Sequence, residues 1–409
     1  MVYLRYLIMA NKPRIRFRGF TEDWEQRKLG DLAEIVRGAS PRPISDSKWF
    51  DNNSDVGWLR ISDVTAQDGR IQYLEQKISK LGQDKTRVVK TPHLLLSIAA
   101  TVGKPVINYV PTGVHDGFLI FLNPKFNILY AFWWLEIFRE EWNKYGQPGS
   151  QVNLNSDLVK NQVINIPNEK EQEKISSFLE ALDRIITLHQ CKLKKLNLAK
   201  KSLLQKLFPR NGSQIPGVRF KGFTDAWEQR KLGDLYKRVN ERNDGTLGRD
   251  KWISVAKMYF QDPDKVQSNN LDTRTYVMKK GDIAFEGHPN NEFKFGRFVL
   301  NDIGTGIISE LFPIYRPITE YDLDFWKYAI QLERVMAPIL AKSITSSGNS
   351  SNKLDHNHFL NKELLVPNIE EQKKIGTLLS LLSKNITLHQ RKLERLQEVK
   401  KGLLQKMFV

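Results

Sequence analysis

The sequence predicts an α+β protein made of two copies of one building block, each a globular domain of mixed α/β structure followed by a long helix. Three observations lead to this prediction. Long stretches of the chain repeat each other, two helix-like segments carry a heptad pattern, and the residues between them form short β-like runs separated by turns. A chain of 409 residues is also too long for one ordinary core, so more than one domain is expected.

The repeat sets the domain organisation. RFRGFTEDWEQRKLGDL at 16–32 returns as RFKGFTDAWEQRKLGDL at 219–235, and residues 167–208 match residues 367–408, where both contain ITLHQ. We call these matched ends the frame. The residues between them, 33–166 and 236–366, share no obvious run of identity and are called the inserts. A period of about 200 residues indicates a duplicated domain rather than a solenoid. The expected segments are a leader at 1–12, a first domain at 13–167, a helix at 168–208, a linker at 209–218, a second domain at 219–367 and a helix at 368–409.

The two long helices are expected to start at Asn168 and Asn368, each followed three residues later by Glu, a pattern resembling a capping box. Apolar residues then recur at alternating spacings of three and four, which is typical of a coiled-coil seam. The expected seam residues are Ile175, Leu179, Leu182, Ile186, His189, Leu193, Leu196, Ile375, Leu379, Leu382, Ile386, His389, Leu393 and Leu396. We interpret His189 and His389 as polar residues that fix the register, in preference to a metal or catalytic role. About 40 residues would give each helix a length of roughly 60 Å.

Both inserts indicate mixed α and β structure in the same order. Strands are expected at 57–61, 93–99, 104–109 and 118–122 in the first insert and at 251–256, 280–285 and 295–300 in the second. Helices are expected at 132–142 and 325–340, and polar loops follow them at 146–153 and 346–352.

The polar loops and a few basic residues are the candidate DNA-reading groups. Gln and Asn can bond adenine edges, Arg and Lys can bond guanine, and Ser or Lys side chains suit phosphates. The candidate DNA-binding residues are Arg60, Lys104, Gln147, Ser150, Gln151 and Asn153 in the first insert and Lys294, Arg297, Ser347, Asn349, Ser350 and Asn352 in the second. An ordinary surface connection is the alternative interpretation of either loop.

The charge balance favours a polyanionic partner. The chain has 63 basic and 46 acidic side chains and a formal net charge of +17, so phosphate neutralisation would favour nucleic acid. A generally basic protein without such a partner is the alternative. The one cysteine, Cys191, excludes an internal disulfide and any multi-cysteine metal site, which fits a reducing cytoplasm. No run approaches the roughly 18 apolar residues that span a bilayer. Either the protein never leaves the cytoplasm, or Met9 is the true start and the apolar leader, assigned to residues 1–12, is an extension.

No catalytic motif is found. The sequence has no phosphate-binding P-loop, no HExxH, no Cys/His cluster and no strand-linked GxGxxG, so no catalytic, cofactor-binding or metal-binding residue is predicted. Residues 123–126, Asn-Pro-Lys-Phe, resemble the Asn-Pro-Pro-Tyr/Phe loop of adenine methyltransferases but have Lys at the second Pro. Without a glycine-rich cofactor loop this segment is interpreted as a turn.

The duplicated RFxGF…WEQRKLGDL openings, the two PNxxEQxKI helix starts and the KKxLLQKxF helix ends resemble the specificity subunits of type I restriction-modification systems over nearly the whole chain. The resemblance implies two target recognition domains related by a pseudo-twofold axis, each reading one half of a split DNA site. It also implies that the paired helices form an antiparallel coiled coil that sets the gap between the half-sites. The apolar leader departs from the family pattern and puts the true N-terminus in doubt.

The resemblance also implies partners and cofactors. Two methylation subunits would bind S-adenosylmethionine and methylate adenine, and restriction subunits would translocate and cut DNA with ATP and Mg²⁺, so this chain itself would need no cofactor. Two other functions stay open from the residues alone. One is a methyltransferase with its own recognition domain, against which the missing cofactor loop argues. The other is a coiled-coil DNA-binding or scaffold protein without a partner enzyme.

Overall fold

The computed structural model describes residues 12–142, 154–210, 212–266, 274–347 and 351–408. The chain divides into two compact units. The first unit contains residues 1–189 and 392–409, and the second contains residues 190–391. Each unit therefore holds one insert, the frame residues that precede it, the start of the long helix of its own repeat and the end of the long helix of the other repeat. The boundaries predicted from sequence instead gave each helix a segment of its own.

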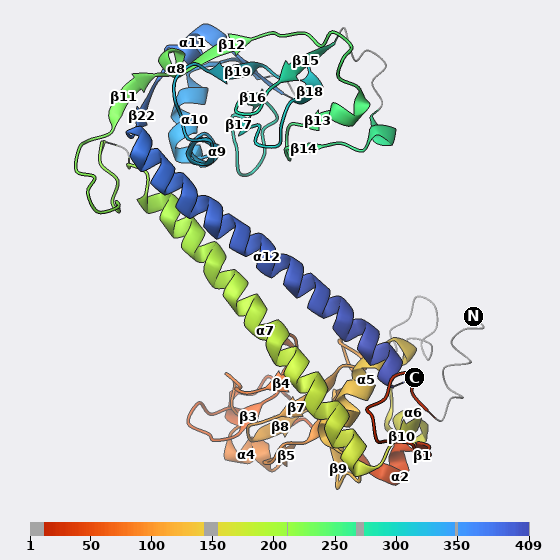
Figure 1. Cartoon of the computed structure of the whole chain (residues 1–409). Helices are drawn as coiled ribbons and strands as arrows, with labels where there is room; N and C mark the ends of the chain where they lie inside the picture. The colour runs from red at the N-terminus through yellow and green to blue at the C-terminus, as the bar shows by residue number, and fades with distance from the viewer. Residues whose placement is uncertain (1–11, 143–153, 211, 267–273, 348–350, 409) are drawn as a thin grey trace. The chain divides into compact units, whose positions relative to one another are not determined.

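The elements of the first repeat follow the predicted order (Figure 1). They are β1 (Glu25–Lys28), α2 (Leu29–Leu32), β2 (Glu34–Arg37), η1 (Ser47–Trp49), β3 (Gly57–Trp58), α3 (Ile61–Ala66), β4 (Arg70–Ile71), α4 (Lys80–Gln83), β5 (Arg87–Val89), β6 (Leu94–Ser97), β7 (Pro105–Asn108), β8 (Thr112–Val114), β9 (Phe118–Leu122), α5 (Ile128–Trp142), α6 (Ser156–Asn161), β10 (Val163–Ile166) and α7 (Glu169–Lys206). The four predicted strands of the first insert are present as β3, β6, β7 and β9, and its predicted helix is present as α5.

The second repeat has a similar order with different details. Its elements are β11 (Glu228–Lys231), α8 (Leu232–Leu235), β12 (Tyr236–Val239), η3 (Arg249–Lys251), β13 (Ile253–Ser254), β14 (Tyr259–Phe260), η4 (Pro263–Lys265), β15 (Thr275–Met278), β16 (Ile283–Glu286), β17 (Arg297–Leu300), β18 (Gly306–Ser309), β19 (Ile314–Pro317), α9 (Leu323–Ala329), α10 (Glu333–Ala341), β20 (Ile344–Ser347), β21 (Asn352–Leu354), α11 (His356–Leu360), β22 (Glu363–Val366) and α12 (Ile369–Met407).

Two predictions for the second insert were wrong in part. The helix expected at 325–340 is broken into α9 and α10, and the two pieces make different contacts. Tyr328 of α9 bonds the Leu379 carbonyl of α12, whereas Arg334 of α10 bonds the Phe208 carbonyl, just beyond the end of α7, at 3.1 Å. The polar loop expected at 346–352 begins and ends in a β-hairpin, in which Ser347 pairs with Asn352. Residues 348–350 of that segment lie outside the described residues.

Both inserts fold around a sheet of the same connectivity. The strand order β2-β9-β6-β7 of the first insert matches β12-β19-β16-β17 of the second, and β4 adds a parallel edge strand in the first. Alternate residues of these strands enter different cores, as the pleat requires. Leu94 and Leu96 pack on the side of α5, for example, whereas Leu95 packs on the side of the smaller sheet β3-β8-β5. The central sheet is thus buried on both faces, which explains its continuous apolar runs.

The frame strands and the starts of the long helices close each domain. β1 pairs with β10, and β11 pairs with β22, in the same antiparallel register. Asn168 and Asn368 cap the long helices, accepting the N–H of the Glu three residues later at 3.0 and 2.9 Å. The Glu171 carboxylate binds Arg16 and the Trp24 indole. The long helices begin and end within three residues of the predicted bounds.

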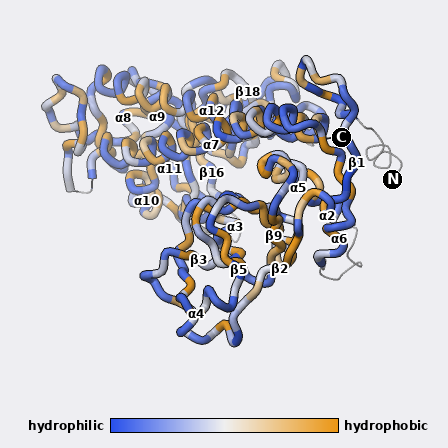
Figure 2. The backbone as a smooth tube through the Cα atoms, turned by 90° about the horizontal axis from the view of Figure 1, so that it is seen from below, coloured by the Kyte–Doolittle hydropathy of each residue, from blue (hydrophilic) through white to orange (hydrophobic). Residues whose placement is uncertain are grey.

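The long helices connect the units in opposite senses. α7 begins in the first unit and ends in the second, and α12 begins in the second and ends in the first. Their predicted seam positions are all buried or partly buried, and polar and apolar residues alternate along both helices in Figure 2. The predicted α+β class, with mixed α/β domains joined by two antiparallel helices, is confirmed. No helix in the described part of the chain is long and apolar enough to cross a membrane.

The end of each long helix completes the core of the other repeat's domain. Met407 and Phe408 at the end of α12 lie in the core that α5 and the first insert build. Leu207 and Phe208 at the end of α7 lie in the corresponding core of the second unit. Ile175, Leu179, Ile375 and Leu379, the first seam residues of each helix, belong to these same cores. The seam therefore continues into both domains.

Candidate nucleic-acid interface

A pocket of about 740 Å³ lies in the first insert, where the loop after β2 meets the turn between β8 and β9. Its lining residues are Ser40, Pro41, Arg42, Pro43, Ile44, Ser45, Trp58, Arg60, Ile61, His115 and Asp116. Gly38 allows the two segments to meet, because a Cβ there would lie 2.2 Å from the carbonyl oxygen of His115. The backbone N–H of Ala39 then bonds the Val114 carbonyl at 3.0 Å. Segments far apart in sequence thus form one wall.

Asp116 is the centre of the polar rim of this pocket. Its carboxylate accepts hydrogen bonds from the Ser40 hydroxyl at 2.6 Å and from Arg42 at 3.0 Å. The Ser40 hydrogen bond is the main cause that lowers the pKa of Asp116, and Arg42 and Arg37 lower it further, so the group is ionised at neutral pH. The Arg42 side chain is 79% exposed. The rim therefore places a carboxylate acceptor beside an exposed guanidinium donor.

The floor of the pocket is aromatic and neutral. Trp58 is buried, and its ring centroid lies 5.9 Å from that of His115, which in turn packs edge-on against Phe118 at 4.9 Å. Burial lowers the pKa of His115, so the imidazole is neutral at physiological pH. Two further arginines lie near Asp116 without lining the pocket: Arg37 donates to the Asp116 carbonyl at 2.6 Å, and Arg87 donates to the Arg37 carbonyl at 2.8 Å.

The second insert has different chemistry in the loop that follows β12. Arg316 binds Asp282 at 2.8 and 2.9 Å and Glu241 at 2.9 Å, and Lys279 binds Glu241 at 3.0 Å. Arg316 and Lys279 lower the pKa of Glu241. Arg242 is partly exposed, binds Glu310 at 2.7 Å, and lies over the Tyr276 ring at 4.9 Å. The same fold therefore carries a different set of donors and acceptors.

Of the two predicted residues of the first insert that the structure describes, Arg60 lines this pocket and Lys104 does not. Arg60 is half-exposed, caps α3 and binds Asp63 at 2.9 Å. The Lys104 side chain is only 13% exposed and is held by Asp68 at 2.6 Å and by Glu136, so it is a structural cation rather than a free DNA ligand. The remaining four predicted residues lie outside the described residues: Gln147, Ser150, Gln151 and Asn153.

The residues predicted in the second insert are scattered. Lys294 is exposed and lies over the Phe295 ring at 5.7 Å. Arg297 is held by Glu286 at 2.7 Å and by the Ala256 carbonyl at 2.8 Å. The backbones of Ser347 and Asn352 pair in the β20–β21 hairpin. Asn349 and Ser350 lie outside the described residues. The structure thus gives Arg297 a structural role and leaves the DNA-binding prediction for the others as a prediction.

Sequence reasoning missed Ser40, Arg42 and Asp116. The run Arg37 to Pro43, which directly follows a strand and contains two arginines, carried a usable signal for a basic loop. Asp116 lies 74 residues from Arg42 in the chain, and only the pairing of β2 with β9 brings them together. Among the described residues, no group of three or more His, Cys, Asp and Glu side chains is placed to hold a metal ion.

Comparisons with known proteins give one consistent family. Residues 21–198 match the family model described as the type I restriction modification DNA specificity domain. The type I restriction enzyme MjaVIII specificity subunit of Methanocaldococcus jannaschii is 21% identical over 94% of this chain and 91% of that protein. The putative type I restriction enzyme MjaX specificity subunit of the same organism is 23% identical over 51% of each chain.

A solved structure shares the fold. The S subunit of a type I restriction-modification system from M. genitalium superposes with a TM-score of 0.58 at 13% identity, covering 97% of this chain and 99% of that one. The similarity extends over both repeats and both long helices. Residues 21–198 therefore match the type I restriction modification DNA specificity domain, and the chain over nearly its whole length is similar to specificity subunits of type I restriction-modification systems.

Proposed function

We propose that the chain reads a split DNA site, one half with each insert, and directs partner subunits that methylate adenine and cut DNA, while performing no chemical step itself. The observation that carries this proposal is that the two inserts share one sheet topology but present different rims. Asp116 with Arg42 stands in the first, and Arg242 over Tyr276 stands in the second. Two unlike readers on one frame predict two unlike half-sites.

S-adenosylmethionine, ATP and Mg²⁺ would be bound by the partners. The long helices of the frame offer a surface for the partner subunits, because each helix carries a second row of exposed apolar side chains beside the seam. Leu188 is 63% exposed and Leu388, its match in the repeat, is 61% exposed. Exposed Ile185 lies about one turn before Leu188, and exposed Leu381 lies about two turns before Leu388. Apolar helix faces of this kind take helices of another chain, and their duplication suits two copies of a methylation subunit.

The proposal is tested by co-expressing the chain with its methylation subunit in a methylation-free host and mapping modified adenines. We expect a motif with two short specified parts and a fixed gap. Replacing residues 33–166 by another family member's insert should change one part and leave the other part and the gap intact. Methylation by this chain alone, or a change in both parts, would contradict the proposal.

Replacing Arg42 by alanine is expected to relax one position of one half-site, because it removes the exposed guanidinium while Ser40 still holds Asp116. Loss of a base contact of this kind costs about 1–3 kcal/mol of discrimination. Methylation mapping should therefore show new bases accepted at that position. Arg242→Ala is the matched variant and should relax the other half-site. If both variants weakened methylation at all motifs equally, the two arginines would be phosphate contacts instead.

Replacing Leu188 by glutamate is expected to remove one methylation subunit from the complex, because a charge would be buried in an apolar helix contact. The ratio of methylation to specificity subunits, measured by native mass spectrometry, should fall from two to one. Leu388→Glu should do the same, and the double variant should leave the chain unpartnered. Lys192→Glu changes charge on the exposed surface of α7 and serves as control. Unchanged stoichiometry in the double variant would exclude this face.

A further inference from the structure

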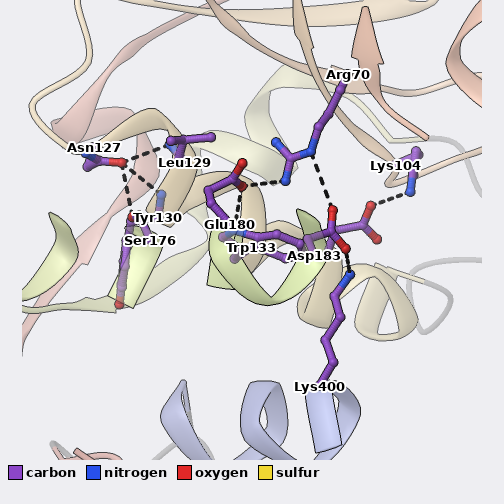
Figure 3. A network of polar contacts seen from close by, with 11 residues as sticks. Arg70, Lys104, Asn127, Leu129, Tyr130, Trp133, Ser176, Glu180, Asp183 and Lys400 are labelled. Carbon is purple, nitrogen blue, oxygen red and sulfur yellow. Dashed lines mark hydrogen bonds and ion pairs between the residues drawn. The ribbon is translucent and has the colours of Figure 1, made fainter. Parts of the chain in front are cut away.

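A cluster of charges joins the first insert to both long helices within the first unit (Figure 3). Arg70, from β4 of the insert, bonds Glu180 of α7 at 2.5 Å and lies 3.8 Å from Asp183. Lys400 of α12 also binds Asp183. The Trp133 indole of α5 donates to Glu180 at 3.1 Å. The insert is therefore attached to the frame by ionic contacts as well as by its apolar core.

The charges in this cluster are largely shielded from water. The side chains of Arg70, Asp183 and Lys400 are 18%, 21% and 20% exposed. The Arg70 guanidinium also lies 4.4 Å from the Phe132 ring centre, and Lys400 lies 4.5 Å from that of Trp133. Each cation therefore depends on the acids of α7 for compensation, because water reaches the cluster poorly.

The second unit has a neutral contact at the same place. The start of the helix after the sheet fixes the correspondence, since the backbone N–H groups of Asn127 and Asp322 bond the matched side chains of Gln172 and Gln372 at 2.8 and 3.2 Å. Six residues on, Trp133 corresponds to Tyr328. The Tyr328 hydroxyl bonds Ser383 at 2.7 Å and the Leu379 carbonyl at 3.1 Å.

The frame itself differs at these positions. Ser380 and Ser383 stand in the second repeat where Glu180 and Asp183 stand in the first. We call Glu180 and Asp183 the acidic pair and Ser380 and Ser383 the serine pair. Lys200, the match of Lys400, lies 5.2 Å from the Tyr328 ring centre, and in the described part of the chain no carboxylate forms an ion pair with it. Burial and the nearby Lys327 lower the pKa of Lys200.

We infer that each of the two insert positions in the frame is complementary to one kind of insert. The acidic pair fits an insert with a cation at the place of Arg70, and the serine pair fits an insert with a neutral hydroxyl at the place of Tyr328. The two positions are therefore not interchangeable, and the mismatch is one-sided. The first insert placed in the second position would bury Arg70 beside Lys200 with two serines in place of two carboxylates. The second insert placed in the first position would bring no uncompensated charge, because Lys327 is already paired with Asp302 of the same insert.

The test uses full-length chains in which residues 33–166 and 236–366 exchange places. Hydrogen exchange of the peptide 128–142 reports on the first insert, and that of 323–341 reports on the second. We expect amide hydrogens of the first insert to exchange with solvent at least about tenfold faster in the second position than in the first. Amide hydrogens of the second insert should exchange no faster in the first position than in the second. Adding S380E and S383D to the exchanged chain should restore slow exchange in the first insert. Equal exchange of the first insert at both positions, or no rescue, would overturn the inference.

A second comparison holds if the exchanged chain does not fold. In the natural order, E180S with D183S should accelerate exchange of peptide 128–142 but not of 323–341. Adding R70Q to that double variant should recover part of the loss, because the uncompensated cation is removed. Slower exchange of peptide 128–142 in the triple variant than in the double variant supports the inference. Faster exchange in the triple variant contradicts it. Neither readout involves DNA or partner subunits, so failure here is distinct from failure of the proposed function.

Discussion

Replacing Glu171 by glutamine is expected to lower the free energy of unfolding of the first unit by about 3–5 kcal/mol, the usual cost of breaking a buried ion pair from one side. The Glu171 side chain is 0% exposed. It accepts two hydrogen bonds from Arg16 at 2.6 and 2.7 Å and one from the Trp24 indole at 3.2 Å. Glutamine keeps the shape but leaves the Arg16 charge uncompensated. Denaturant unfolding followed by unit-resolved hydrogen exchange measures the loss.

The duplicated frame supplies a matched control for this prediction. Glu371 accepts from Arg219 at 2.8 and 2.7 Å and from Trp227 at 3.1 Å in the second unit. Glu371→Gln should therefore destabilise the second unit by a similar amount and leave the first unchanged. If either single variant lowered the hydrogen-exchange protection of both units, the units would unfold together. That result would contradict the prediction that each buried Glu–Arg contact stabilises only its own unit.

Replacing Phe408, the second-last residue of the given sequence, by alanine is expected to destabilise the N-terminal domain by about 3–5 kcal/mol. Phe408 is buried in the first unit, where its ring centroid lies 5.1 Å from that of Tyr130. The loss combines the lost burial of the ring with the cavity left behind. Hydrogen exchange in β6 and β9 should accelerate, whereas exchange in β16 and β19 should not.

Phe208→Ala is the counterpart in the second unit. Phe208 packs against Phe325 at 5.4 Å and Trp227 at 5.8 Å. It should therefore loosen the domain that follows it in the chain and spare the domain that precedes it. If each variant instead destabilised the domain of its own repeat, the end of each long helix would not pack in the core of the other repeat's domain as described.

The amino-acid sequence alone determined the parts that depend on local patterns. The duplicated frame, the bounds of the long helices and the buried strands around Leu94 and Phe118 follow from repetition, capping and continuous apolar runs. These signals are short in range, so they can be read without knowing what each segment packs against. The family resemblance rested on the same frame motifs and was confirmed by the comparisons.

The tertiary structure alone decided which distant residues share a site. Asp116 meets Arg42 because β2 pairs with β9, and Glu180 meets Arg70 because α7 packs beside the insert. Lys104 was predicted as a DNA-binding residue, but the fold places the carboxylates of Asp68 and Glu136 beside its ammonium group. Partner choice among charged groups depends on distances that the chain order does not contain. Local sequence patterns therefore predicted the frame, whereas tertiary packing decided which charged groups lie together.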